Sequence, residues 1–306
     1  MANIRGFYVN LDHCEERRQR LERNLKRLEI AQRYERFPAI SGDEQNAEVR
    51  GMNAGEFGIW QTWLELLRNV STTATYDWDY LHVLEDDAEI SSQFIDFCDQ
   101  LSGSEPVFHL LVTDMYVNPS IYRALAEQHD QMKWRDAIKI RRDVYSGCLS
   151  SVMIHRGRVT SVLRLLEEVW TQPGQLLPLD NTLRRLMHER RLSIARTAPF
   201  LTSVREADVL QSSIQPRQNQ SVDVVLTQAL CTHLRRQLST LEDNEDLASI
   251  SQLLIRLSEA KNSNQSRRTR RLLTEQMLHI AEKESLLMYA RDPRLDAEPD
   301  NGQLKR

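Results

Sequence analysis

Short apolar runs and amphipathic stretches alternate along the first two-thirds of the chain. Continuous apolar runs predict buried strands, and apolar residues three and four positions apart predict helices that bury one face. The predicted strands are residues 6–11, 36–40, 80–84, 107–113 and 149–154. The predicted helices are residues 15–28, 54–70, 91–101, 158–170 and 182–189. This alternation predicts an α/β fold, with an open, mainly parallel sheet that carries helices on both faces.

The pattern changes after a polar stretch at residues 215–220. Beyond it, apolar residues follow only helical spacing, up to about residue 290. We therefore expect residues 1–220 to form one α/β domain and residues 221–306 to form an appendage of about three helices. The last residues, after Pro293, are expected to be a disordered tail.

Composition narrows the functional classes. The chain has 306 residues, with 40 Lys and Arg against 44 Asp and Glu, and a net charge of −4. This balance argues against a protein that coats nucleic acid, and we expect no DNA partner. No apolar run approaches the roughly 20 residues of a membrane span, and the N-terminus lacks a secretory signal. The four cysteines are far apart, which predicts reduced structural thiols. We expect a cytoplasmic protein, with attachment at the inner face of the membrane as an alternative.

The acidic triplet Glu85-Asp86-Asp87 directly follows an apolar strand. Three adjacent carboxylates repel one another and cannot be buried without compensation. Open α/β sheets bind their ligands at the carboxyl ends of the strands. A carboxylate cluster there suits Mg²⁺ or Mn²⁺, which would take its remaining ligands from water and a diphosphate. The alternative is a solvated acidic turn without a ligand.

Several short motifs occur in order around this triplet. They are YVNLD at residues 8–12 with ERRQR at 16–20, FPAISG at 37–42, GEFG at 55–58, LEDDA at 84–88 and SG at 146–147. Weaker matches are LD at residues 179–180 and QSSI at 211–214. The ordered set resembles the family-25 glycosyltransferases, a group that includes bacterial lipooligosaccharide galactosyltransferases and collagen galactosyltransferase-like proteins. The resemblance covers about residues 4–216.

The resemblance implies a GT-A fold and a metal-dependent, inverting transfer of a hexose from a UDP-sugar to a hydroxyl group. Galactose or glucose is the expected sugar, and the acceptor is a glycan, a lipid-linked molecule or a protein. Asp87, assisted by Glu85 or Asp86, would hold Mn²⁺ or Mg²⁺ and so stabilise the charge of the departing diphosphate. An inverting reaction needs a general base. Asp180 is the first candidate and Asp114 the second, with helix capping as the alternative role for Asp180.

Further residues are expected to bind the donor. Asn10 and Asp12 follow the first strand, where a uracil or ribose would lie, although turn and cap chemistry would also explain them. Arg17 suits a diphosphate, and a solvated helix face is its alternative. Glu56 would bond sugar hydroxyls, or it serves only as an acid in the first turn of a helix.

One pair of residues departs from the family pattern. The family commonly carries a Ser-His pair after its GExG motif, whereas this chain has Thr62 and Trp63. Threonine keeps the hydroxyl, but tryptophan replaces an imidazole with a large aromatic ring. This departure motivates the alternative of a catalytically silent scaffold whose helical region binds a protein partner. The C-terminal helices are otherwise expected to form a homodimer or to recognise the acceptor.

Overall fold

The computed structural model describes most of the first two-thirds of the chain and a few positions beyond it. The described residues are 2–72, 77–101, 105–117, 121, 125, 138–142, 144–204, 230–233, 235–236, 238, 253, 256 and 276. The QSSI motif, most of the expected helical appendage and the expected C-terminal tail therefore lie outside the described residues.

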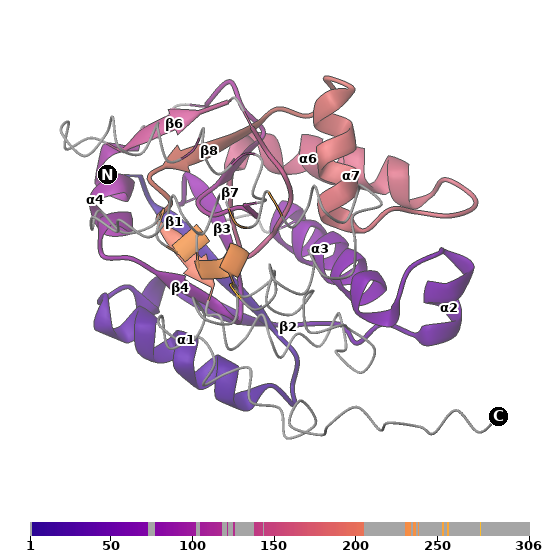
Figure 1. Cartoon of the computed structure of the whole chain (residues 1–306), viewed down its shortest axis with the longest axis horizontal. Coiled ribbons are helices and arrows are strands. Elements are labelled where there is room, and N and C mark those ends of the chain that lie inside the picture. The colour runs from indigo at the N-terminus through magenta and orange to yellow at the C-terminus, as the bar shows by residue number, and fades with distance from the viewer. Residues whose placement is uncertain are drawn as a thin grey trace.

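A seven-stranded sheet forms the centre of the fold (Figure 1). Its strands are β1 (Ile4–Asn10), β2 (Tyr34–Pro38), β3 (Tyr80–Glu85), β5 (Leu110–Val112), β6 (Lys139–Arg141), β7 (Ser151–His155) and β8 (Ile194–Ala198). Their order is β2-β1-β3-β7-β5-β8-β6. Strands β1, β2, β3, β5 and β8 run in one direction, and β7 and β6 run against them. The expected α/β fold with a mainly parallel sheet is confirmed.

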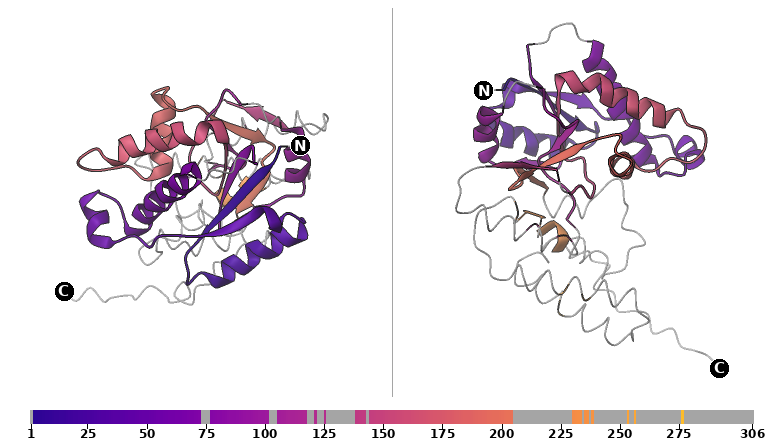
Figure 2. Two further views of the ribbon diagram at one scale, coloured as in Figure 1. Left: turned by 180° about the vertical axis from the view of Figure 1, so that it is seen from behind. Right: turned by 90° about the horizontal axis from the view of Figure 1, so that it is seen from above.

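Helices cover both faces of this sheet (Figures 1 and 2). The helices are α1 (Glu15–Arg27), α2 (Glu44–Val49), α3 (Ala54–Thr72), α4 (Gln93–Gln100), α6 (Arg156–Trp170) and α7 (Leu179–His188), with a short 3-10 helix, η1 (Ala31–Arg33). Successive strand residues point to opposite faces, so Leu81 and Val83 join the core under α3, α6 and α7. Tyr80 and Leu84 join the core under α1 and α4. This two-sided burial explains the continuous apolar runs in the sequence.

The acidic triplet forms a tight turn between two strands. Strand β3 ends at Glu85, and after Asp86 and Asp87 the chain enters β4 (Ala88–Ile90). Strand β4 pairs antiparallel with β9 (Thr202–Val204) in a second, two-stranded sheet. Because both ends of the turn are held in sheets, the three carboxylates have a fixed position beside the carboxyl end of β1.

Two glycines allow the loop after β2 to touch helix α3. A Cβ atom on Gly58 would lie 2.8 Å from the amide nitrogen of Gly42, and nearer still to the carbonyl oxygen of Ile40. A Cβ atom on Gly42 would meet the backbone of Ala54 and Gly58. The glycines of the FPAISG and GEFG motifs therefore have a packing role, which is close approach of two backbone segments.

Side chains beyond residue 220 belong to the core of the sheet. Leu230, Cys231, Leu238 and Leu253 are buried in the same cluster as the inner residues of α3 and α6. The backbone amide of Phe200 donates to the carbonyl oxygen of Leu238 at 3.0 Å. A division of the chain at residue 220 stays a prediction, but the packed core does not end there. No described helix combines the length and apolar character that a bilayer span requires.

A buried histidine joins β3 to its neighbours. The ring of His82 is fully buried and stacks on Phe94 with centroids 4.8 Å apart. Its Nδ1 lies 2.7 Å from the hydroxyl of Tyr34, and its Nε2 lies 2.7 Å from Oγ of Ser151. Burial lowers the pKa of His82 to about 3, so the ring is neutral in the folded protein at neutral pH.

We expect this histidine to make the protein less stable in acid. Its pKa is 6.5 in the unfolded chain and about 3 in the fold, so the unfolded state gains the proton first as the pH falls below 6.5. The free energy of unfolding should then drop by up to about 1.4 kcal/mol per pH unit between these values. Urea unfolding of the wild type and a His82→Asn variant across this range measures the difference. Parallel stability curves for the two proteins would contradict the prediction.

Candidate active site

A cavity of about 310 Å³ lies at the carboxyl ends of β1 and β3, against the first half of α3. Its walls are formed by residues 9–11, 13, 14 and 17, the loop at 39–42, helix α3 and the acidic turn. Of the predicted site residues, Asn10, Arg17, Glu85, Asp86 and Asp87 meet at this cavity. The resemblance motifs that follow β1, β2 and β3 therefore converge in space, as the topology of a parallel sheet requires.

Helix α3 supplies an apolar wall. Ile59 and Trp63 line the cavity, although Trp63 is only 3% exposed and most of its ring packs in the core. The hydroxyl of Thr62 donates to the carbonyl of Gly58 at 2.7 Å and accepts from the amide of Ile40 at 2.9 Å. The hydroxyl at position 62 thus holds the loop after β2 against α3. Position 63 supplies an aromatic surface without a titratable group.

Both oxygens of the Asp86 carboxylate have protein partners. The side-chain amide of Asn10 donates to Oδ2 of Asp86 at 2.7 Å, and the guanidinium of Arg17 lies 3.3 Å from Oδ1. Asn10 also donates to the carbonyl of Cys14 at 3.0 Å. Asp86 is therefore oriented and balanced by charge before any ligand binds. Asn10 is 1% exposed, and it acts on the site by holding Asp86.

Arg36, which the sequence analysis missed as a site residue, supports Asn10 from strand β2. Its Nε donates to Oδ1 of Asn10 at 3.1 Å, and a second guanidinium nitrogen donates to the Asn10 carbonyl at 3.1 Å. The same guanidinium binds Asp12, and this hydrogen bond, together with its charge, holds the pKa of that carboxyl below its usual range. Asp12 neither lines the cavity nor caps α1, whose N-cap is Cys14 without a side-chain hydrogen bond.

The acidic turn concentrates negative charge. Burial raises the pKa of Glu85 to about 8, and the carboxylates of Asp87 and Asp86 add to this shift. The carboxylate of Asp180 acts in the same direction, while the positive charge of Arg235 opposes it. Glu85 is thus surrounded by acids on two elements, the turn itself and helix α7. A cation placed here would relieve their mutual repulsion.

The donor set suits an open site for a hard divalent cation. Across the described parts of the chain, no three His, Cys, Asp or Glu side chains converge closely enough to form a closed metal cage. Mg²⁺ is commonly held by one or two carboxylates, with substrate phosphates and water as further ligands. Asp87 and Glu85 offer oxygen ligands at the cavity wall, as such an ion requires.

Glu56 and Asp180 lie outside the cavity wall. The carboxylate of Glu56 accepts from the amide of Asn53 at 3.0 Å, and Oδ1 of Asn53 accepts from the amide of Glu56 at 2.9 Å. This reciprocal pair is a capping box for α3. Asp180 lies inside the first turn of α7 rather than before the helix, and its Oδ1 accepts from the amide of Asn181 at 2.7 Å. A Cβ atom on Gly147 would be 3.1 Å from Oδ2 of Asp180.

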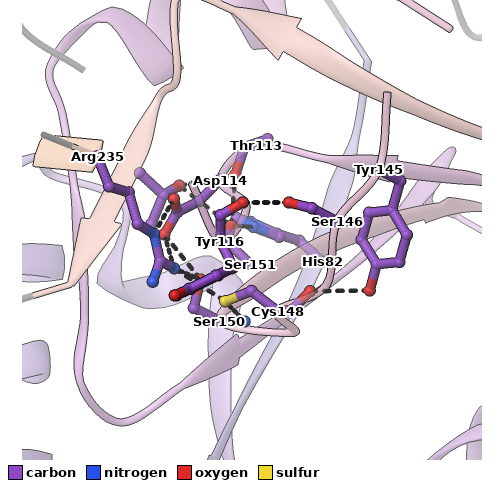
Figure 3. Close-up of polar contacts among 11 residues, drawn as sticks. His82, Thr113, Asp114, Tyr116, Tyr145, Ser146, Cys148, Ser150, Ser151 and Arg235 are labelled. Carbon is purple, nitrogen blue, oxygen red and sulfur yellow. Dashed lines mark hydrogen bonds and ion pairs between the residues drawn. The ribbon is translucent and has the colours of Figure 1, made fainter. Parts of the chain in front are cut away.

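Asp114 is enclosed in a buried ion pair (Figure 3). Nε of Arg235 donates to Oδ1 of Asp114 at 2.5 Å, and another nitrogen of the same guanidinium binds Oδ2. The hydroxyl of Ser150 also donates to Oδ2, at 2.9 Å. Its side chain is fully buried and both of its oxygens are engaged, so Asp114 has no oxygen left to accept a proton as a general base would.

Comparisons with known proteins add little. No protein-family model matches the chain, so membership of the family-25 glycosyltransferases is not confirmed. No curated protein matches its sequence. Among solved structures, mouse xyloside xylosyltransferase 1 in its apo form is similar, with a TM-score of 0.27 and 9% identity. The match covers 62% of this chain and 63% of that protein. A likeness of this size establishes neither a shared activity nor a shared substrate.

The glycine contact beside the cavity gives a stability prediction. We expect Gly58→Ala to lower the free energy of unfolding by about 1–3 kcal/mol, because the new methyl group meets backbone atoms that cannot move aside. Gly157→Ala in α6 is the matched control, since its methyl group meets side-chain atoms rather than backbone, namely the flexible end of Glu105 and, at 3.3 Å, Nδ1 of His155. Urea unfolding compares the two variants. Equal stabilities would show that the loop after β2 moves freely away from α3.

Proposed function

We propose that the protein is a glycosyltransferase that moves a hexose, galactose or glucose, from a UDP-sugar to a hydroxyl group of an acceptor, with Mn²⁺ or Mg²⁺. The observation that carries the proposal is the convergence of Asn10, Arg17 and the acidic turn at one cavity beside the carboxyl ends of β1 and β3. Glycans, lipid-linked molecules and proteins all offer suitable hydroxyl groups as acceptors.

The chemistry of the cavity fits a nucleoside diphosphate. Its volume of about 310 Å³ is within the range of small-molecule sites. The apolar wall formed by Ile59 and Trp63 suits the flat face of a base. Arg17 offers a guanidinium that matches phosphate oxygens, and the acidic turn lies within its reach through Asp86. One cavity thus combines an apolar surface, a cationic group and oxygen ligands for a metal.

The residues of the chain have separate tasks in this proposal. A divalent cation, when bound, stabilises the negative charge that develops on the leaving diphosphate. Asp87 and Glu85 hold it at the cavity wall, while Asn10 and Arg17 keep Asp86 in place. Asp180 accepts the proton of the attacking hydroxyl, because it lies near Glu85 at the same edge of the sheet. Asp114 is omitted from this role, since Arg235 occupies both of its oxygens.

The aromatic residue at position 63 favours a second candidate function. A scaffold that binds a nucleotide without catalysis would need the cavity but not an imidazole at position 63, where the resembled family commonly has one and this chain has Trp63. Such a scaffold would bind UDP and release nothing from UDP-sugars. A wild-type protein with this behaviour would therefore support the scaffold over the enzyme.

The metal ligand gives a direct test of the enzyme. We expect the wild type to release UDP from one UDP-sugar in the presence of Mn²⁺, with water replacing the acceptor. Asp87→Asn should lower this rate by about 100-fold or more, because it removes a charged oxygen ligand without changing size. EDTA should have the same effect. Asp99→Asn is the control, since Asp99 is an exposed acid on α4. Full activity in the Asp87 variant would refute the metal assignment.

The proposed base gives a second test, in which binding and chemistry separate. We expect Asp180→Asn to lower the rate of UDP release by about 10²–10⁴-fold, the usual contribution of general base catalysis. Its affinity for UDP with Mn²⁺ should stay within about twofold of the wild type, because Asp180 does not line the cavity. Calorimetry and a rate assay on the same sample measure both quantities. An unchanged rate would exclude Asp180 as the base.

A further inference from the structure

Arg235, which follows the last described strand by about thirty residues, places its side chain in the centre of the fold. Its guanidinium binds both oxygens of Asp114, and it also donates to Sγ of Cys148 at 2.8 Å and to Oγ of Ser150 at 3.0 Å. Figure 3 shows these groups around the guanidinium. The Arg235 side chain is 7% exposed, so this is a buried ion pair with additional hydrogen bonds.

The turn that Arg235 binds is joined to the proposed metal site by a backbone hydrogen bond. The backbone amide of Glu85 donates to the carbonyl of Ser150 at 2.9 Å. On the other side of the turn, the amide of Tyr116 donates to the carbonyl of Gly147 at 3.0 Å. Residues 147–150, here named the clamp turn, therefore connect Arg235 to the first residue of the acidic turn. The same clamp turn passes Asp180, which lies against Gly147.

The clamp turn has a backbone shape that needs external support. Gly147 has φ of 123° and Cys148 has φ of 87°. A non-glycine residue with positive φ is strained, and such strain persists only where surrounding contacts hold it. Arg235 donates hydrogen bonds to the side chains of the strained residue, Cys148, and of Ser150, two positions later. The hydroxyl of Tyr145 donates to the carbonyl of Cys148 at 3.1 Å and so holds the backbone of the same residue.

We propose that Arg235 is a positioning residue of the transfer site, which holds the clamp turn against Glu85. This inference rests on the proposed function for its catalytic meaning. It also extends the catalytic unit to residue 238 at least, because buried Leu230 and Cys231 and the Leu238 carbonyl anchor the segment that carries Arg235.

Removing Arg235 alone would be uninformative. It would leave the Asp114 carboxylate buried without a partner, which destabilises a fold strongly whatever its function. Lysine is no substitute, since it lacks the planar fork that reaches two oxygens and the clamp turn together. Replacing both partners with apolar residues of similar size avoids the lone charge. The informative variant is therefore the double substitution Arg235→Met with Asp114→Leu.

A second variant keeps the ion pair and cuts only its connection to the clamp turn. Cys148→Ala with Ser150→Ala removes the two acceptors that Arg235 binds there and the hydrogen bond from Ser150 to Asp114, while Asp114 keeps both of its bonds to Arg235. The matched control is Arg68→Gln with Glu167→Gln. It removes an exposed ion pair between α3 and α6, with 2.8 Å between Nε and Oε1, away from the cavity.

The experiment measures backbone hydrogen exchange, urea unfolding and UDP release from the UDP-sugar used by the wild type. In both test variants we expect the amides of Glu85 and Tyr116 to exchange at least tenfold faster than in the wild type, because their acceptors lie in the clamp turn. We expect kcat to fall at least tenfold while KM changes less than threefold. The control variant should match the wild type in exchange and in kcat.

Two results would overturn the inference. One is wild-type exchange at Glu85 and Tyr116 in a folded test variant. The other is wild-type kcat in the same variant. If the Arg235 and Asp114 double variant does not fold, the Cys148 and Ser150 variant decides the question. If the wild type releases UDP from no UDP-sugar, the proposed function fails, and hydrogen exchange alone decides whether Arg235 holds the clamp turn.

Discussion

The structure around the cavity depends on how negative charge is balanced at one edge of the sheet. Glu85, Asp86 and Asp87 leave a buried strand together, and carboxylates cannot be placed there without compensation. Asp86 is balanced by Arg17 and oriented by Asn10. The repulsion is greatest at Glu85, whose pKa is raised to about 8 by burial and by the neighbouring carboxylates. Such an arrangement favours a ligand that places a cation against these carboxylates.

The same balance explains why distant parts of the chain meet here. Arg17 comes from α1 and Arg36 from β2, and Arg235 follows the described sheet by about thirty residues. Each guanidinium offers several donors in a fixed plane, so one side chain can orient a carboxylate and hold a loop at once. Arg36 does this for Asn10 and Asp12, and Arg235 does it for Asp114 and the clamp turn. Arg36 and Arg235 therefore hold the site from behind the residues that face the cavity, whereas Arg17 faces the cavity itself.

Periodicity predicted the long elements because burial on one or two faces leaves a direct trace in sequence. It missed β4, β6 and β9, which have three residues each and are too short to show a period. It also missed β8, whose sequence IARTA places polar side chains in buried positions. The direction of β7 could not be predicted, since a strand buried on both faces has the same apolar pattern in either orientation.

Asn10 and the acidic triplet could be predicted to lie together because the positions of strand ends follow from the fold. Arg17 lies in helix α1 and was predicted from the chemical match of guanidinium to phosphate. Arg36 and Arg235 could not be predicted, because nothing local marks which carboxylate an arginine will meet. The capping box of Asn53 and Glu56 could have been predicted from the sequence, since an Asn followed three residues later by a Glu is its signature.

Thr62 and Trp63, which stand where the resembled family commonly carries a Ser-His pair, have separate structural roles in this fold. The hydroxyl at position 62 links Gly58 to Ile40, so threonine preserves a contact that holds the loop after β2. Trp63 is nearly buried, and its exposed edge forms part of the cavity wall. A Thr-Trp pair at these positions therefore keeps the frame of the cavity and offers no group that carries a proton. The imidazole of His13 also lines the cavity, so proton transfer at this site has both an imidazole and the carboxylates proposed as bases to draw on. Of the two proposed as bases, only Asp180 has an oxygen that no buried arginine occupies.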